Sequence, residues 1–170
     1  MFQLKGFVKN GLDSSSIINI IVSCDSEFSD FKERGFMFPP HLFYYHEISW
    51  PEIIGVLINS YKFTKDEAVR SMNKLISVFN LQKIKRTPSD ELIETLVQQA
   101  NETLAQNNTR LTIGRNDIII IAGFWREKVH FVHSGDEAFA KTCEKLGLNA
   151  VPVPQRQFLK EKEIKRWTRK

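Results

Sequence analysis

The sequence has few of the residues that build disulfide frameworks or sulfur-ligated metal sites. Its 170 residues include two cysteines, Cys24 and Cys143, which are far from a Cys-x-x-Cys spacing. This scarcity excludes a disulfide scaffold in practice and argues against a cysteine-based zinc site. Because Cys143 falls within an apolar helical pattern, we expect a small buried side chain there rather than a catalytic thiol.

Long apolar runs are also missing. The most apolar stretch, residues 118–125, is too short to cross a bilayer, and residues 1–11 hold no run long enough for a signal peptide. We therefore expect a soluble, cytoplasmic protein without membrane association. Hydrophobic residues make up 42% and charged residues 26%, which is typical of a globular chain that buries a core without disulfides.

Histidine is scarce as well, and its spacing does not suggest a zinc site. His130 and His133 lie three apart on an expected strand, so their side chains should point to opposite faces of a sheet. His41 and His46 also differ in parity. We interpret all four as ordinary strand or rim residues.

The net charge of +4 leans weakly toward polyanionic partners. Much of the positive charge lies near the C-terminus, so we divide the chain into a domain over residues 1–155 and a basic tail or helix over residues 156–170. Lys165, Arg166 and Arg169 in this tail could follow the phosphates of a nucleic acid, giving salt-sensitive affinity. A solvated chain end is the plainer interpretation.

Strand-like and helix-like segments alternate along the chain, which predicts an α/β domain with a mainly parallel sheet. The expected strands cover residues 7–12, 41–48, 81–85, 129–133 and 150–153. The expected helices begin at residues 13 or 14, 28, 49, 64, 87, 117 and 134. In the helix that follows residue 87, the apolar positions Leu92, Ile93, Leu96, Val97, Ala100 and Leu104 fall on one face.

Four acids occupy the same kind of position in this pattern. Asp13, Glu52 and Asp136 each follow an expected strand at the start of a helix, and Asp117 starts a helix after a loop. The crevice beyond the carboxyl ends of parallel strands is where such sheets bind ligands. The four carboxylates are therefore expected to converge on one cleft, although they are remote in sequence.

Helix capping is the alternative explanation for each acid taken singly. Free N–H groups and the helix dipole favour carboxylates in any first helical turn. Ser49 with Glu52, and Ser134 with Glu137, have the spacing of a capping box. Asp13 could likewise be a simple N-cap.

The acids lie in four short segments, LDSSSII at 12–18, ISWPEIIGVL at 48–57, NDIIIIA at 116–122 and FVHSGDEAF at 131–139. Their order resembles that of the PIN-domain nucleases, including the VapC-type toxins, over about residues 12–154. The resemblance implies a three-layer α/β/α sandwich with a central, mainly parallel sheet of four to five strands. The polar first strand and the basic tail depart from the usual pattern of the family.

The same resemblance implies a metal-dependent endoribonuclease that leaves a 3′-hydroxyl and a 5′-phosphate. Asp13, Glu52, Asp117 and Asp136 would bind Mg²⁺ or Mn²⁺ and carry the catalysis, and hard cations do prefer oxygen ligands. The implied supporting residues are Ser15, Ser134, Asn116 and Glu137. Arg115, beside Asp117, is a candidate for contact with an RNA phosphate. An antitoxin protein and a homodimer are further partners that the resemblance suggests.

Two other functions fit the same residues. The chain could be a non-catalytic or weakly catalytic RNA-binding PIN module of an RNA-processing assembly. It could also be a phosphatase or a receiver-like α/β protein, because these folds cluster acids as well. That last class needs an Asp nucleophile with a distinctive Lys or Thr, and the sequence places no convincing candidate.

Overall fold

The structure, a computed structural model, describes residues 6–23 and 41–152. These residues contain one five-stranded sheet in the order β3-β2-β1-β4-β5, in which every pairing is parallel. The strands are β1 (Val8–Leu12), β2 (His41–His46), β3 (Gln82–Ile84), β4 (Phe131–Ser134) and β5 (Asn149–Pro152). The predicted α/β class and parallel sheet are confirmed. The helix expected from residue 28 lies outside the described residues.

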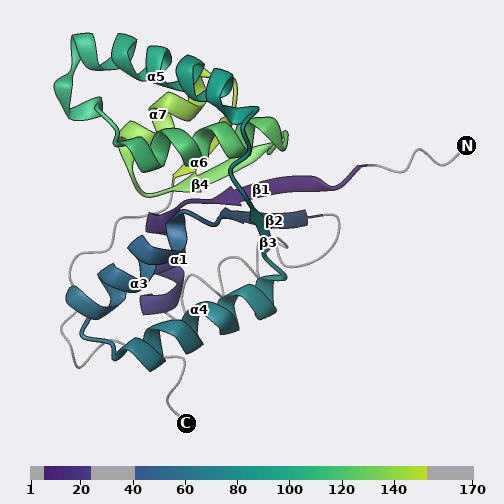
Figure 1. Ribbon diagram of the computed structural model, residues 1–170, viewed down its shortest axis with the longest axis vertical. Helices are drawn as coiled ribbons and strands as arrows, with labels where there is room; N and C mark the ends of the chain where they lie inside the picture. Colours follow the sequence, from purple (N-terminus) through teal and green to yellow (C-terminus); the bar gives the residue numbers. More distant parts are fainter. Residues whose placement is uncertain (1–5, 24–40, 153–170) are drawn as a thin grey trace, which may run out of the picture.

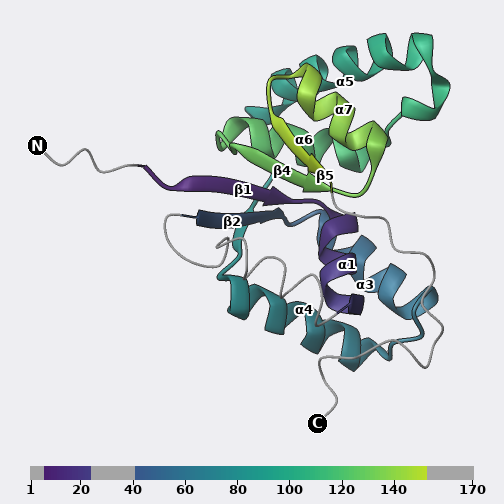
Figure 2. The same ribbon diagram turned by 180° about the vertical axis from the view of Figure 1, so that it is seen from behind.

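Helices cover both faces of the sheet (Figures 1 and 2). One face carries α1 (Ser14–Ser23), α3 (Ser49–Asn59) and α4 (Lys65–Phe79). The other carries α5 (Asp90–Asn107), α6 (Arg115–Arg126) and α7 (Glu137–Lys145), with a short 3₁₀ turn, η1 (Thr109–Leu111), between α5 and α6. The result is the predicted three-layer α/β/α sandwich.

The strand order reverses at the pair β1 and β4. The chain runs outward from β1 to β2 and β3, then returns to place β4 and β5 on the other side of β1. Such a reversal leaves a crevice at the carboxyl ends of the two central strands. Leu12 is paired with His133 in the register of this ladder, so the residues that follow, Asp13 and Ser134, meet at the crevice.

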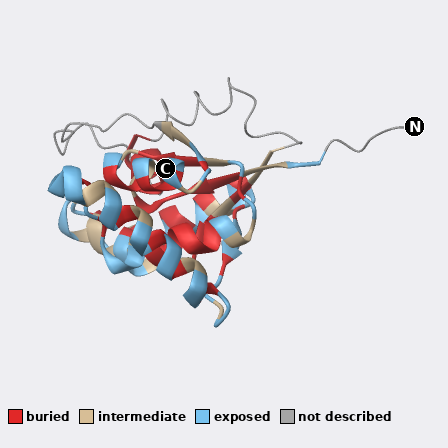
Figure 3. Cartoon of the chain, turned by 90° about the horizontal axis from the view of Figure 1, so that it is seen from above, coloured by how far each residue is buried: buried red, intermediate tan, exposed pale blue. Residues whose placement is uncertain are grey.

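Two apolar layers flank the sheet, and Figure 3 shows the buried residues gathered in the interior. Helix α1 is buried on nearly every side, which explains why its sequence is apolar all round. The large side chains that fill the two layers include Ile17, Ile53, Leu57, Met72 and Leu75 on one face and Ile120, Ile121, Phe124, Val132 and Phe139 on the other. This packing fixes where the first turns of α1, α3, α6 and α7 lie.

Helix α5 buries only part of the apolar face that its sequence predicts. Val97 is buried, and Ile93 and Leu104 pack against the core, but Leu92 is 80% exposed and Leu96 is 51% exposed. The buried side of the helix also includes Asp90, Glu94 and Asn101. The two buried acids have arginine partners from other elements, which offset the cost of burying charge.

Side-chain hydrogen bonds are present at the starts of α4 and α5. The capping box of Thr64 and Glu67 is present, with both reciprocal hydrogen bonds. At the start of α5, the carboxylate of Asp90 accepts hydrogen bonds from the backbone N–H and the hydroxyl of Thr87.

No helix in the described part of the chain has the length and apolarity needed to cross a bilayer.

Candidate functional site

Asp13 lies at the centre of the candidate site, directly after β1. Its Oδ1 accepts a hydrogen bond of 2.8 Å from the backbone N–H of Ser16, so it does cap α1. The hydroxyls of Ser15, Ser16 and Ser134 also donate to its carboxylate. The capping role and the site role therefore coexist in this one side chain.

Burial sets the protonation behaviour of Asp13. The carboxyl is buried, and this desolvation raises its pKa above the usual value. The hydrogen bonds from Ser134, Ser16 and Ser15 act in the opposite direction, because they stabilise the charged form. The three serines thus hold a carboxylate in one orientation at a place where water does not solvate it.

The loop after β4 is tied to the loop after β1. The backbone N–H of Asp136 donates to the Ser134 hydroxyl at 3.0 Å, and the N–H of Gly135 donates to the Ser15 hydroxyl at 2.9 Å. The carboxylate of Asp136 caps α7 by accepting from the N–H of Phe139 at 3.1 Å. Ser134 and Glu137 therefore do not form the capping box that their spacing allows, because Asp136 is the N-cap and Ser134 serves Asp13.

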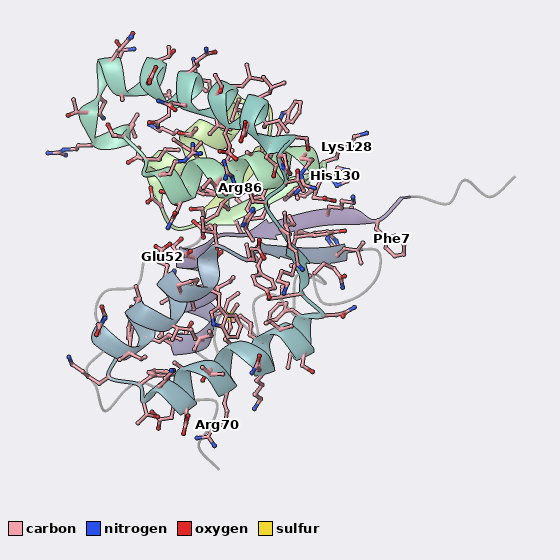
Figure 4. The ribbon with its side chains drawn as sticks, in the orientation of Figure 1. Phe7, Glu52, Arg70, Arg86, Lys128 and His130 are labelled. Atoms are coloured by element: carbon pink, nitrogen blue, oxygen red, sulfur yellow. The ribbon has the colours of Figure 1, made fainter. Side chains whose placement is uncertain are left out.

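Glu52 reaches the site from the first turn of α3. The capping box that Ser49 and Glu52 could form is absent, since α3 follows Ile48 without a side-chain cap. The Glu52 carboxylate instead accepts a hydrogen bond of 3.1 Å from the hydroxyl of Ser14. Figure 4 shows the exposed Glu52 side chain at the end of the sheet, where α3 begins.

Asp117 completes the group from the first turn of α6, where it is half-buried. Burial raises the pKa of its carboxyl, and the negative charges of Asp136, Glu52 and Asp13 add to this effect in that order, which brings the value to about 6. Like charges raise the pKa of a carboxyl in this way only when they are near. The four acids from remote segments therefore lie near enough to affect the ionisation of Asp117, and we call this group the acidic site.

The donor set suits a hard divalent cation, because it consists of carboxylate and hydroxyl oxygens. Among the described residues, however, no three His, Cys, Asp or Glu side chains already stand as a complete set of ligands. Glu52 and Asp136 are exposed, so rotation of these two side chains would be the adjustment needed.

The remaining predicted residues lie around the acidic site with other partners. Asn116 is exposed in the first turn of α6, and Glu137 forms an ion pair of 3.0 Å with Lys141. Arg115 pairs with Glu94 at 2.6 Å. Lys165, Arg166 and Arg169 lie outside the described residues, so their proposed contact with RNA stays a prediction.

Two residues that support the acids, Ser14 and Ser16, were not predicted from the sequence. Ser14 holds Glu52, and Ser16 donates to both the Asp13 carboxylate and the backbone carbonyl of His133. The available signal was the run of three serines directly after Asp13. A serine at these positions predicts a supporting role only weakly, because serine is common at any helix start.

The fold is shared with solved structures of remote sequence. A chain of the VapBC2 structure from Rickettsia felis, bound to a DNA fragment from their promoter, matches with a TM-score of 0.59 and 16% identity, covering 85% of this chain and 98% of that chain. For VapBC-1 from nontypeable Haemophilus influenzae, the TM-score is 0.61 at 15% identity, with coverage of 85% and 98%. A domain of a functionally unknown protein from Methanocaldococcus jannaschii matches with a TM-score of 0.51 at 16% identity, covering 89% and 95%.

The sequence matches no protein-family profile and no curated protein. At these identities the likeness to solved structures establishes the fold, which is the PIN-like sandwich that the four sequence segments indicated. The chemistry of the site must therefore be argued from its own residues.

Proposed function

We propose that this chain is a divalent-metal-dependent endoribonuclease that hydrolyses RNA phosphodiester bonds. The observation that carries the proposal is the set of acids at the switch point of a parallel sheet, where the charges of Asp136, Glu52 and Asp13 raise the pKa of Asp117. Helix capping explains Asp13 and Asp136 singly. It does not explain why acids from four elements lie within reach of one another.

A cluster of carboxylates without a counterion is costly, because each charge disfavours ionisation of the others. A bound Mg²⁺ or Mn²⁺ would offset this repulsion, polarise the phosphate and lower the pKa of water. Asp13 is held by Ser15, Ser16 and Ser134 before any ligand arrives, so it is a fixed point of the site. Glu52 and Asp136 are exposed and would approach from two other sides.

The decisive experiment compares cleavage of a single-stranded RNA by the natural chain, Asp13→Asn and Asp117→Asn. With magnesium or manganese present, we expect cleavage by the natural chain and none by either variant, and chelation with EDTA should stop the reaction. Asp66→Asn is the matched control, because Asp66 also lies in the first turn of a helix, α4, and is exposed. Cleavage by Asp13→Asn and Asp117→Asn at the natural rate would refute the site.

A second candidate, an RNA-binding PIN module without catalysis, is favoured by one observation. No three acids among the described residues stand as a preformed ligand set. Calorimetric titration with Mn²⁺ separates the two functions. Metal binding that is lost in Asp117→Asn supports the enzyme, and RNA binding without metal binding supports the module.

The structural likenesses also suggest partners. Two of the matched chains come from VapBC structures, one of them bound to promoter DNA. We extend this to a proposed antitoxin protein for the present chain and to a homodimer, in addition to the RNA substrate. Co-purification with the product of an adjacent small gene and light scattering of the purified protein test these two proposals separately.

A further inference from the structure

Two arginines from different elements share one buried carboxylate close to the acidic site. Glu94 lies on α5, and its side chain is 3% exposed. Arg86, in the connection between β3 and α5, donates from Nε at 2.8 Å and from Nη2 at 2.9 Å. Arg115, the first residue of α6, donates from Nη2 to Oε1 at 2.6 Å. Glu94 thus holds a pair of guanidinium groups, which we call the arginine pair.

The arginine pair is held tightly and carries positive charge. The Nη2 atoms of Arg86 and Arg115 both contact Oε1 of Glu94, so the two cations are within a few ångströms of each other. One carboxylate faces two guanidinium groups, which leaves an excess of one positive charge. Hydrogen bonds from Arg86 keep the pKa of Glu94 below its usual value, so the carboxylate stays ionised around neutral pH.

Within the described part of the chain, both arginines keep N–H donors that form no hydrogen bond. A guanidinium has five N–H donors. Glu94 engages only part of each set, and the side chains of Arg86 and Arg115 are 40% and 57% exposed. A phosphate can therefore reach the remaining N–H groups while the ion pairs with Glu94 stay intact.

A neighbouring arginine shows what a purely structural pair looks like here. Arg126 is only 24% exposed and donates to Asp90, to Glu127 and to the backbone carbonyl of Lys85. It already fastens α6 to the start of α5. The arginine pair differs because it is more exposed and, among the described residues, is paired with Glu94 alone.

The arginine pair adjoins the acidic site through the first turn of α6. Arg115 precedes Asp117 by two residues in the first turn of α6, so both belong to the same edge of the sandwich. Arg115 is paired with Glu94, so the arginine pair and the acids are separate charge clusters that meet at the start of α6. Figure 4 shows Arg86 on the α5–α6 side of the sheet and Glu52 at the strand ends.

Resting on the nuclease function proposed above, we propose that Arg86 and Arg115, positioned by Glu94, bind a backbone phosphate of single-stranded RNA next to the phosphate held at the acidic site. Guanidinium pairs recognise phosphate oxygens through parallel N–H···O bonds, which an ammonium group does not reproduce. The site contacts no base, so it contributes affinity and placement without sequence preference.

The test uses Arg86→Gln and Arg115→Gln with a single-stranded RNA oligonucleotide and magnesium. Each substitution should raise KM by about tenfold and leave kcat within about twofold, because a flanking contact supports binding more than chemistry. The double variant Arg86→Gln/Arg115→Gln should reduce the slope of log affinity against log salt by about 0.7, the share of one phosphate contact to a single strand, and each single substitution should reduce it by part of that amount. Arg70→Gln, on α4 across the sheet in Figure 4, is the matched control and should change neither quantity.

Glu94→Gln tests the positioning role, because positioning and simple electrostatics predict opposite changes in RNA affinity. Removing a negative charge should by itself strengthen RNA binding. If Glu94 positions the arginine pair, the substitution should weaken binding instead, because the amide N–H₂ cannot accept a hydrogen bond from a guanidinium. Tighter RNA binding by a folded Glu94→Gln protein would overturn the positioning role. The exposed Arg86 and Arg115 variants keep the test valid if this buried change unfolds the chain.

Failure of this inference is distinct from failure of the proposed function. If the natural chain neither binds nor cleaves RNA with magnesium or manganese, the nuclease proposal fails and the inference falls with it. If the natural chain cleaves RNA while Arg86→Gln and Arg115→Gln keep the KM and salt slope of the Arg70→Gln control, only the arginine pair is refuted.

Discussion

The hydroxyl of Ser134 donates a hydrogen bond to the Asp13 carboxylate, across a sequence separation of 121 residues. The contact exists because β1 and β4 are neighbours whose carboxyl ends are in register. It makes Ser134 a support for a buried acid and, through the N–H of Asp136, a link to a second acid. Two of the four acids, Asp13 and Asp136, are thus tied to the ends of β1 and β4.

Replacing Ser134 with alanine should destabilise the protein. The buried Asp13 carboxylate would lose a charge-assisted hydrogen bond, and we expect the free energy of unfolding to fall by about 1–3 kcal/mol. The pKa of Asp13 should rise further, since that hydrogen bond lowers it. Urea denaturation measures the first effect, with Ser77→Ala on the exposed side of α4 as the control. Equal midpoints for the two variants would contradict the support role.

The pH dependence of the unfolding free energy should reveal the cost of ionising Asp117 in the folded state. Its pKa is about 6 in the folded state against 3.8 for the unperturbed group, so between these values the folded state binds more protons. Stability therefore falls as pH rises through this window, and the full cost is present above about pH 6. Asp117→Asn removes the cost, so its unfolding free energy should exceed that of the natural chain at pH 7.5 by on the order of 1–2 kcal/mol.

The same comparison at low pH provides the internal check. As pH falls below 3.8 toward about 3 the carboxyl becomes protonated in both states, so the advantage of Asp117→Asn should disappear. Asp66→Asn, which changes an exposed acid on α4, should show no such window. An advantage of Asp117→Asn that is constant between pH 4 and pH 7.5 would indicate a cause other than ionisation.

Adding Mn²⁺ or Mg²⁺ should stabilise the natural chain, because a ligand that binds only the folded state raises its unfolding free energy. At one hundred times the dissociation constant the gain is about 2.7 kcal/mol. The effect should shrink in Asp117→Asn and also at pH 5, where protons compete for the carboxylates. Thermal melts with metal, and with metal plus EDTA, measure it. A melting temperature unmoved by saturating Mn²⁺ at pH 7.5 would argue against the metal site.

Two helical glycines should respond to alanine in opposite directions. A Cβ at Gly55 in α3 meets no atom within 4 Å, so Gly55→Ala should gain about 0.8–1 kcal/mol of helix propensity. A Cβ at Gly123 in α6 would lie 2.7 Å from Cδ2 of the buried His46 and 3.0 Å from Cγ2 of Ile84. The overpacking cost of about 1–3 kcal/mol should exceed the same propensity gain. Chemical denaturation of both variants tests the close packing of α6 on β2.

The sequence by itself determined the alternation of strands and helices, the parallel sheet and the edge at which the acids gather. These follow from local periodicity and from the rule that helical crossovers make neighbouring strands parallel. The place of Asp13 at the start of α1 and of Glu52 at the start of α3 could be read from short segments. The start of a helix at residue 64 was predicted correctly, and the capping box of Thr64 that fixes it is equally local.

Only the tertiary structure decided which partner each polar side chain takes. Glu52 accepts a hydrogen bond from the hydroxyl of Ser14 instead of forming a local capping box. Glu94 is buried because two remote arginines reach it, while Leu92 and Leu96 on the same helix are exposed. Local patterns record what a residue can do within one turn of chain. The choice among partners depends on desolvation and on charges brought together by strand order, and neither quantity exists until the layers have packed.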